Sequence, residues 1–123
     1  MQFQSGVPIL RIFDEGKAKD FYLGFLGFAL DWEHRFEPGM PLYAQISRSG
    51  CVLHLSEHHG DASPGGAVRI EVDDIDGYHA EITAKGYPFM RPGIEAMPWG
   101  TREIKVIDPF FNRLMFFSRL AQG

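Results

Sequence analysis

Apolar and polar residues alternate along much of the chain with a period of two residues, the pattern of strands that bury one face. In the clearest case Ile104 and Val106 share one face, while Lys105 lies on the other. A second alternating run, which extends to residue 117, follows the pair Asp108-Pro109. Proline suits a turn because it has no N–H for a strand ladder. The two runs therefore predict a hairpin with one apolar and one mixed face.

Further strands are predicted by the same reasoning, and segments rich in Gly and Pro separate them. The predicted strands cover residues 7–13, 28–36, 42–47, 51–56 and 67–72, and a short one opens at 87–89. Ser49-Gly50 lies between two of these runs and predicts a hairpin turn. A turn is expected at 37–41, a polar loop at 58–66 and a further loop at 92–98.

Two segments instead carry apolar residues at helical spacing. The first begins after the candidate N-cap Asp14 and ends at Gly27. Its apolar stripe consists of Ala18, Phe21, Tyr22, Phe25 and Leu26. The second begins after Asp73 or Asp74 and ends at Gly86. Its stripe consists of Ile75, Tyr78, His79 and Ile82.

The order of these elements repeats along the chain. A constant shift lays Asp73 on Asp14 and Gly86 on Gly27, and each half reads strand, helix, then three strands. We therefore expect one domain over residues 1–123, with a first module at about 7–56, a linker at about 57–66 and a second module at about 67–120.

Composition narrows the class of protein. A chain of 123 residues with 45% hydrophobic content can bury a core as a single domain, and its eleven Phe supply large apolar groups. The net charge of -4 and the lack of Lys or Arg runs argue against nucleic acid as a partner. Cys51 is the single cysteine, so no internal disulfide is expected. No secretory signal or membrane-spanning stretch is evident, which predicts a cytoplasmic protein without a membrane partner.

Four short motifs follow one another on this doubled pattern. They are Asp20-Phe21-Tyr22 with Leu26-Gly27-Phe28, then Val72-Asp73-Asp74, then Trp99-Gly100-x-Arg102-Glu103, and finally Asp108-Pro109-x-x-Asn112. With these motifs the chain resembles the vicinal-oxygen-chelate superfamily, which includes glyoxalase I, extradiol dioxygenases, and fosfomycin and bleomycin resistance proteins. The resemblance extends over roughly Val7 to Leu120. One departure is Phe111, where the family usually carries a turn glycine.

The resemblance implies an α+β fold of two tandem βαβββ modules whose curved mixed sheets form a cleft, usually completed by dimerisation. In the metal-dependent enzymes of the superfamily, side chains from four strands hold one divalent ion. Those positions fall here at Val7, His54, Ala67 and Met115. Val and Ala cannot bind a metal and a thioether is a poor ligand for such ions. We therefore expect no metal, no cofactor and no catalytic residue.

The closest resemblance is to bleomycin resistance proteins, in which aromatic rings bind the ligand. Trp32 and Trp99 stand at such positions, and two rings can sandwich a planar group. The alternative is that both are core or dimer-interface residues. Val7-Pro8-Ile9-Leu10 is similar to the family's N-terminal strand, which implies a homodimer that can exchange these strands.

Polar residues on the mixed strand faces complete the candidate site. If the apolar residues face the helices, His54, Arg69, Glu103 and Arg113 face the opposite way, toward either a cleft or solvent. They are the side chains expected to orient a ligand that stacks on the rings. Asp31 and Glu33 flank Trp32 and either attract a cationic group or are ordinary solvated charges.

Neighbouring histidines raise a metal site as an alternative. His54, His58 and His59 are close in sequence to Glu57 and Asp61. The first lies in a predicted strand and the others in a loop, so these residues do not share the single face that a helical pair would offer.

Three hypotheses follow. The first is a bleomycin-resistance-like protein that sequesters a planar, preferably cationic, antibiotic without metal or chemistry. The second is a metal-dependent glyoxalase- or dioxygenase-type enzyme of the same superfamily. The third is a binding module whose cleft serves an unrelated metabolite.

Overall fold

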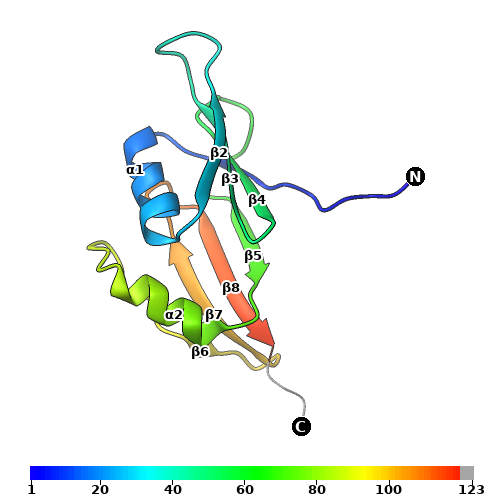
Figure 1. The fold of residues 1–123 in the computed structure, drawn as a ribbon, viewed down its shortest axis with the longest axis vertical. Coiled ribbons are helices and arrows are strands. Elements are labelled where there is room, and N and C mark those ends of the chain that lie inside the picture. The colour runs from blue at the N-terminus through cyan, green and yellow to red at the C-terminus, as the bar shows by residue number, and fades with distance from the viewer. Residues whose placement is uncertain (120–123) are drawn as a thin grey trace.

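The fold was analysed in a computed structural model that describes residues 1–119. The first module contains β1 (Ile9–Arg11), α1 (Glu15–Lys19) with its continuation η1 (Asp20–Phe25), β2 (Ala29–His34), β3 (Tyr43–Arg48) and β4 (Cys51–Ser56). The second contains β5 (Ala67–Glu71), α2 (Ile75–Ala84), β6 (Glu95–Ala96), β7 (Thr101–Ile107) and β8 (Arg113–Arg119). Figure 1 shows both modules with their helices on the same side. The predicted end of the second module, at about 120, lies outside the described residues.

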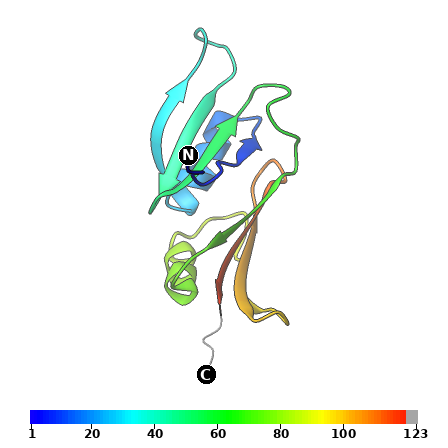
Figure 2. The ribbon, with the colours of Figure 1, turned by 90° about the vertical axis from the view of Figure 1, so that its right-hand side faces the viewer.

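The two modules build sheets of the same topology. The strand orders are β1-β4-β3-β2 and β5-β8-β7-β6. β1 pairs in parallel with β4, and β5 pairs in parallel with β8, whereas all other neighbouring strands of the two sheets are antiparallel. Figure 2 shows one sheet above the other, with neither closed into a barrel. The prediction of an α+β fold made of two tandem βαβββ modules is confirmed.

The two helical segments begin at equivalent aspartate caps, but the first segment is one residue longer than the second. Asp14 accepts a hydrogen bond from the N–H of Lys17, and Asp74, rather than Asp73, accepts one from the N–H of Gly77. The span from Asp14 to the glycine that follows the first helix is therefore one residue longer than its counterpart. The extra residue is accommodated in η1, a stretch of π-helix, where hydrogen bonds skip one residue further along the chain.

The segment after α2 differs from the sequence-based expectation. Residues 88–89 form a turn and Tyr87 lies in irregular structure before it, so the prediction of a strand that begins at 87–89 is wrong. The Tyr87 ring instead stacks on Phe25, with centroids 4.5 Å apart, which holds this segment against the helices. The edge strand β6 lies within residues 92–98, which were expected to be a loop. A strand of two residues is too short to show an alternating pattern.

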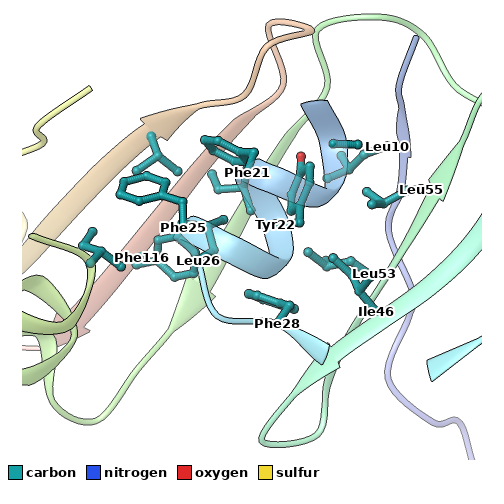
Figure 3. Close-up of a cluster of buried hydrophobic side chains, with 14 of the residues drawn as sticks. Leu10, Phe21, Tyr22, Phe25, Leu26, Phe28, Ile46, Leu53, Leu55 and Phe116 are labelled. Carbon is teal, nitrogen blue, oxygen red and sulfur yellow. The ribbon is translucent and has the colours of Figure 1, made fainter. Parts of the chain in front are cut away.

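A single hydrophobic core lies between the helices and both sheets. Figure 3 shows part of this core. Its largest fully buried side chains are Ile12, Phe21, Tyr22, Phe25, Leu26, Ile46, Leu53, Ile82, Ile104, Val106, Leu114 and Phe116. The expected alternation of the last hairpin holds, because Ile104 and Val106 are buried while Lys105 is exposed. The sheet faces that point away from this core are where the candidate site residues lie.

The Asp108-to-Asn112 turn ties the two modules together. One carboxylate oxygen of Asp108 accepts the N–H groups of Phe110 and Asn112, each at 2.8 Å. The other oxygen accepts the Tyr22 hydroxyl at 2.6 Å and the Asn112 amide at 2.8 Å. The same amide donates to the carbonyl of Arg11 in β1. This motif therefore links the two modules, whereas the sequence predicted only a local turn.

Candidate functional site

An aromatic platform occupies the open face of the first sheet. The Trp32 ring lies nearly parallel to Tyr43, at 12° with centroids 6.0 Å apart, and meets the His54 ring edge-on at 5.4 Å. Trp32 remains 41% exposed. These side chains come from β2, β3 and β4, where Trp32 pairs with Gln45 and Gln45 pairs with His54 across the strands. The platform therefore offers the partly exposed Trp32 indole, whose position is fixed by contacts with the Tyr43 and His54 rings.

A chain of hydrogen bonds fixes the polar side of this platform. The Gln45 amide donates to Asp31 at 3.0 Å, which leaves its carbonyl oxygen 3.0 Å from Nε2 of His54. Nε2 is therefore the donor, and Nδ1 accepts the Tyr43 hydroxyl at 2.7 Å. Ser47 also donates to Asp31, at 2.9 Å. Both ring nitrogens of His54 are engaged within the protein.

A β-bulge explains how Asp31 and Trp32 reach the same face. The register of β2 against β3 shifts between Leu30 and Trp32. A bulge sets two successive residues against one partner and redirects a side chain that simple alternation would send to the other face. Asp31 consequently contacts Gln45 and Ser47 beside the tryptophan. These two hydrogen bonds lower the pKa of Asp31 below its usual value and keep it anionic, and the bond from Gln45 has the larger effect.

A buried carboxylate organises the open face of the second sheet. Glu103 is only 3% exposed, and Arg69 donates to both of its oxygens at 3.0 and 2.8 Å. It also accepts the Thr101 hydroxyl at 2.6 Å and the Trp99 indole N–H at 3.1 Å. These donors, Arg69 foremost, lower the pKa of Glu103 to about 2 against the raising effect of burial. Trp99, 63% exposed, is thus anchored at its nitrogen and free on its ring.

Basic side chains lie next to this carboxylate along the strands. Arg69, Met115 and Lys105 pair across three adjacent strands, and Arg113 lies two residues earlier on β8. The Arg69 guanidinium also lies over the Phe117 ring, 4.5 Å from its centroid. Within residues 1–119, neither Lys105 nor Arg113 forms an ion pair. This part of the sheet face is therefore positively charged.

The six residues singled out from the sequence fall into two groups. Trp32 and His54 meet on the first sheet, and Trp99, Arg69 and Glu103 meet on the second. Arg113 is exposed at the start of β8 and contacts neither group through a hydrogen bond among the described residues. Across residues 1–119, no aromatic contact joins the two tryptophans.

Sequence reasoning missed the side chains that hold the platform together. Tyr43, Gln45 and Ser47 lie on one face of β3, and their alternation with Ala44 and Ile46 was the available signal. Thr101 was missed because nothing local marks a hydroxyl as the partner of a carboxylate two residues away.

A family model described as glyoxalase superfamily protein matches residues 1–123. The chain belongs to the glyoxalase superfamily. The fold agrees with solved members, since the crystal structure of a bleomycin-binding protein complexed with bleomycin superposes with a TM-score of 0.71. That structure shares 20% identity and covers 95% of this chain and 99% of its own. No curated protein sequence matches the chain.

Two further solved structures have the same architecture. A glyoxalase-related enzyme from Clostridium phytofermentans has a TM-score of 0.74 at 20% identity, and covers 98% of each chain. TnmS3, an antibiotic binding protein from Streptomyces sp. CB03234, has a TM-score of 0.67 at 23% identity, over 97% of this chain and 99% of that one. No helix within residues 1–119 has the length and apolar character needed to cross a membrane.

The residues at the superfamily's metal positions do not fit a divalent ion. Val7 precedes β1, and the side chains that flank His54 across the strands are those of Ile9 and Gln45. Met115 lies between two cationic side chains, and both nitrogens of His54 are already hydrogen-bonded. Residues 1–119 contain no cluster of three His, Cys, Asp or Glu able to hold a metal.

Proposed function

We propose that this chain binds a planar small molecule bearing a cationic group and holds it without chemistry. The observation that carries the proposal is the platform of Trp32, Tyr43 and His54 with the fixed carboxylate of Asp31 beside it. A planar ring system stacks on the exposed indole face, which contributes about 1 kcal/mol beyond the burial of apolar area. The carboxylate attracts the cationic group.

The two acids that flank Trp32 have different roles. Glu33 forms an ion pair with Lys19 at 3.0 Å, so its charge is already compensated. Asp31 accepts only neutral donors, and no cation pairs with it among residues 1–119. Asp31 is therefore the side chain assigned to the cationic substituent.

The second sheet provides the other aromatic contact. Glu103 is surrounded by donors and serves to position the Trp99 indole, which then presents its ring to the ligand. Arg69 and Arg113 are assigned to polar acceptor groups of the ligand, because both carry exposed guanidinium groups on this face. Since the two tryptophans lie on separate sheets, we propose that a second copy of the chain brings opposite faces together in a homodimer.

The ionisable groups of the site are consistent with binding that is not followed by a reaction. A general base works best with a pKa near the operating pH, whereas the pKa of Glu103 is about 2. The two nitrogens of His54 are occupied by Tyr43 and Gln45. Structural similarity to the bleomycin-binding protein and to TnmS3, an antibiotic binding protein, supports the binding of a small molecule.

A fluorescence titration tests the proposal. Bleomycin and a set of planar cations are added while tryptophan emission is recorded for the wild type, Trp32→Phe and Trp99→Phe. We expect saturable quenching by at least one compound, with weaker binding in both variants. Phe36→Ala, a change at an exposed aromatic outside the site, serves as the control. If every compound quenches the variants as strongly as the wild type, the two tryptophans do not form the site.

A further inference from the structure

A hollow lies away from the sheet faces, where the first helix, the segment after α2 and the Asp108 turn meet. It has a volume of about 540 Å³. Its apolar lining comes from Tyr87, Phe89, Met90, Ile107, Pro109 and Phe111. Sites that hold small molecules have volumes of this order and are lined mainly by apolar and aromatic side chains.

Two of the lining phenyl groups are unusually exposed. Phe89 is 81% exposed and Phe111 is 78% exposed. The first is not loose, because its ring meets that of Tyr87 edge-on at 5.3 Å, and Tyr87 in turn stacks on the buried Phe25. The hollow therefore has a wall that is connected to the core and an outer surface of accessible aromatic rings.

Phe111 occupies a strained backbone position. Its φ angle is 69°, in the left-handed region that residues with a Cβ atom rarely adopt. The turn imposes this angle, because Asp108 accepts the N–H groups of the residues on either side, Phe110 and Asn112. A glycine would fit here without strain. The exposed Phe111 ring gains little burial in return, so the strain is not offset within the chain.

Strain of this kind points to a role outside the folding of the chain. We propose that the hollow is a second ligand site, which takes a planar aromatic small molecule against Phe89 and Phe111. Lys17 and Asp20, from the first helix and its continuation, lie at its polar edge, and neither forms an ion pair within residues 1–119. This site is separate from the platform on the first sheet and from Trp99, and it does not depend on the function proposed for them.

Substitutions at Phe111 test the proposal because binding and stability should change in opposite directions. The probe is 1-anilinonaphthalene-8-sulfonate, a planar aromatic anion whose fluorescence rises on binding. We expect saturable binding to the wild type and about tenfold weaker binding to Phe111→Gly and Phe111→Asn. Both variants should melt at a higher temperature, since glycine and asparagine tolerate the left-handed conformation.

Two further variants locate the bound probe on the protein. Phe89→Ala should also weaken binding, whereas Phe36→Ala, at an exposed ring outside both sites, should leave it unchanged. Unchanged binding in Phe111→Asn and Phe89→Ala would overturn the proposal. It would also be overturned if sedimentation showed that Phe111→Asn dissociates a dimer, because the phenyl groups would then cover an interface between copies of the chain.

Discussion

The Tyr22 hydroxyl donates a hydrogen bond of 2.6 Å to the carboxylate of Asp108, which joins the first helix to the turn before the last strand. Both residues are buried, and burial together with the carboxylate raises the pKa of Tyr22 well above its usual value. The tyrosine hydroxyl is therefore protonated at neutral pH and donates to Asp108. This bond is one of several polar links between the two modules, together with those from Arg48 to Glu81 and from Tyr78 to the carbonyl of Leu26.

Removal of that hydroxyl should weaken the whole domain. Tyr22→Phe leaves one lone pair of a buried carboxylate without its donor, so we expect a loss of about 1–3 kcal/mol in the free energy of unfolding. Urea denaturation measures this loss. Tyr87→Phe is the matched control, because the described structure contains no hydrogen bond from that hydroxyl, and it should change stability by about 0.5 kcal/mol or less. Equal effects of the two substitutions would contradict the assigned role.

The pKa of Glu103 predicts a dependence of stability on pH. Because its pKa falls from 4.5 to about 2 on folding, the unfolded chain binds the proton more tightly. Its contribution is therefore complete above pH 4.5 and is lost as the pH falls toward 2. Glu103→Gln should be less stable than the wild type at neutral pH, and the difference should shrink below pH 4.5.

Denaturation curves at a series of pH values test this behaviour. Subtracting the curves of the two proteins removes the contribution of the other carboxylates. Glu71→Gln is the control, since that carboxylate forms only an exposed ion pair with Arg119. A difference between wild type and Glu103→Gln that stays constant down to pH 2 would show that Glu103 is not the perturbed group.

Charge at the tryptophan platform should decide which ligands bind. Asp31→Asn removes the uncompensated carboxylate, and we expect about three- to tenfold weaker binding of planar cations, with neutral analogues unaffected. Glu33→Gln, which alters a carboxylate already paired with Lys19, should have little effect. Calorimetric titration at low and moderate salt measures both. Equal losses in the two variants would indicate general attraction to an acidic surface.

Metal content separates the binding protein from a metal-dependent enzyme. The protein purified without chelator should contain only trace amounts of Zn, Ni, Mn or Fe by elemental analysis. Ligand affinity should be unchanged by EDTA, since neither Met115 nor the doubly hydrogen-bonded His54 offers an adequate ligand set. A stoichiometric, tightly held ion would favour the enzyme hypothesis instead.

The period of the apolar residues was sufficient to predict the fold, but it could not predict local irregularities. Two helical stripes and alternating strands are repeated signals, so the doubled module could be recognised. The bulge that places Asp31 beside Trp32 breaks the alternation on which such reasoning depends. The bonds from Asn112 to Arg11 and from Tyr22 to Asp108 join residues far apart in sequence, which no local pattern reports.

The candidate site was predictable in its residue types more than in their roles. Arg69 and Glu103 were both expected on the mixed face, and both lie there. Their mutual pairing, and the burial of Glu103 beneath the Trp99 indole, depend on how neighbouring strands are aligned. Strand register must be known before a charged residue can be assigned to a ligand or to another side chain.

The most direct test of the central claim is to recover the ligand after binding. A compound that quenches Trp32 emission is held with the protein in equilibrium dialysis, and after denaturation its mass is measured. We predict retention inside the dialysis chamber, loss of that retention in Trp32→Ala, and recovery of the compound with its mass unchanged. Recovery of a chemically altered compound that depends on the protein would contradict the account.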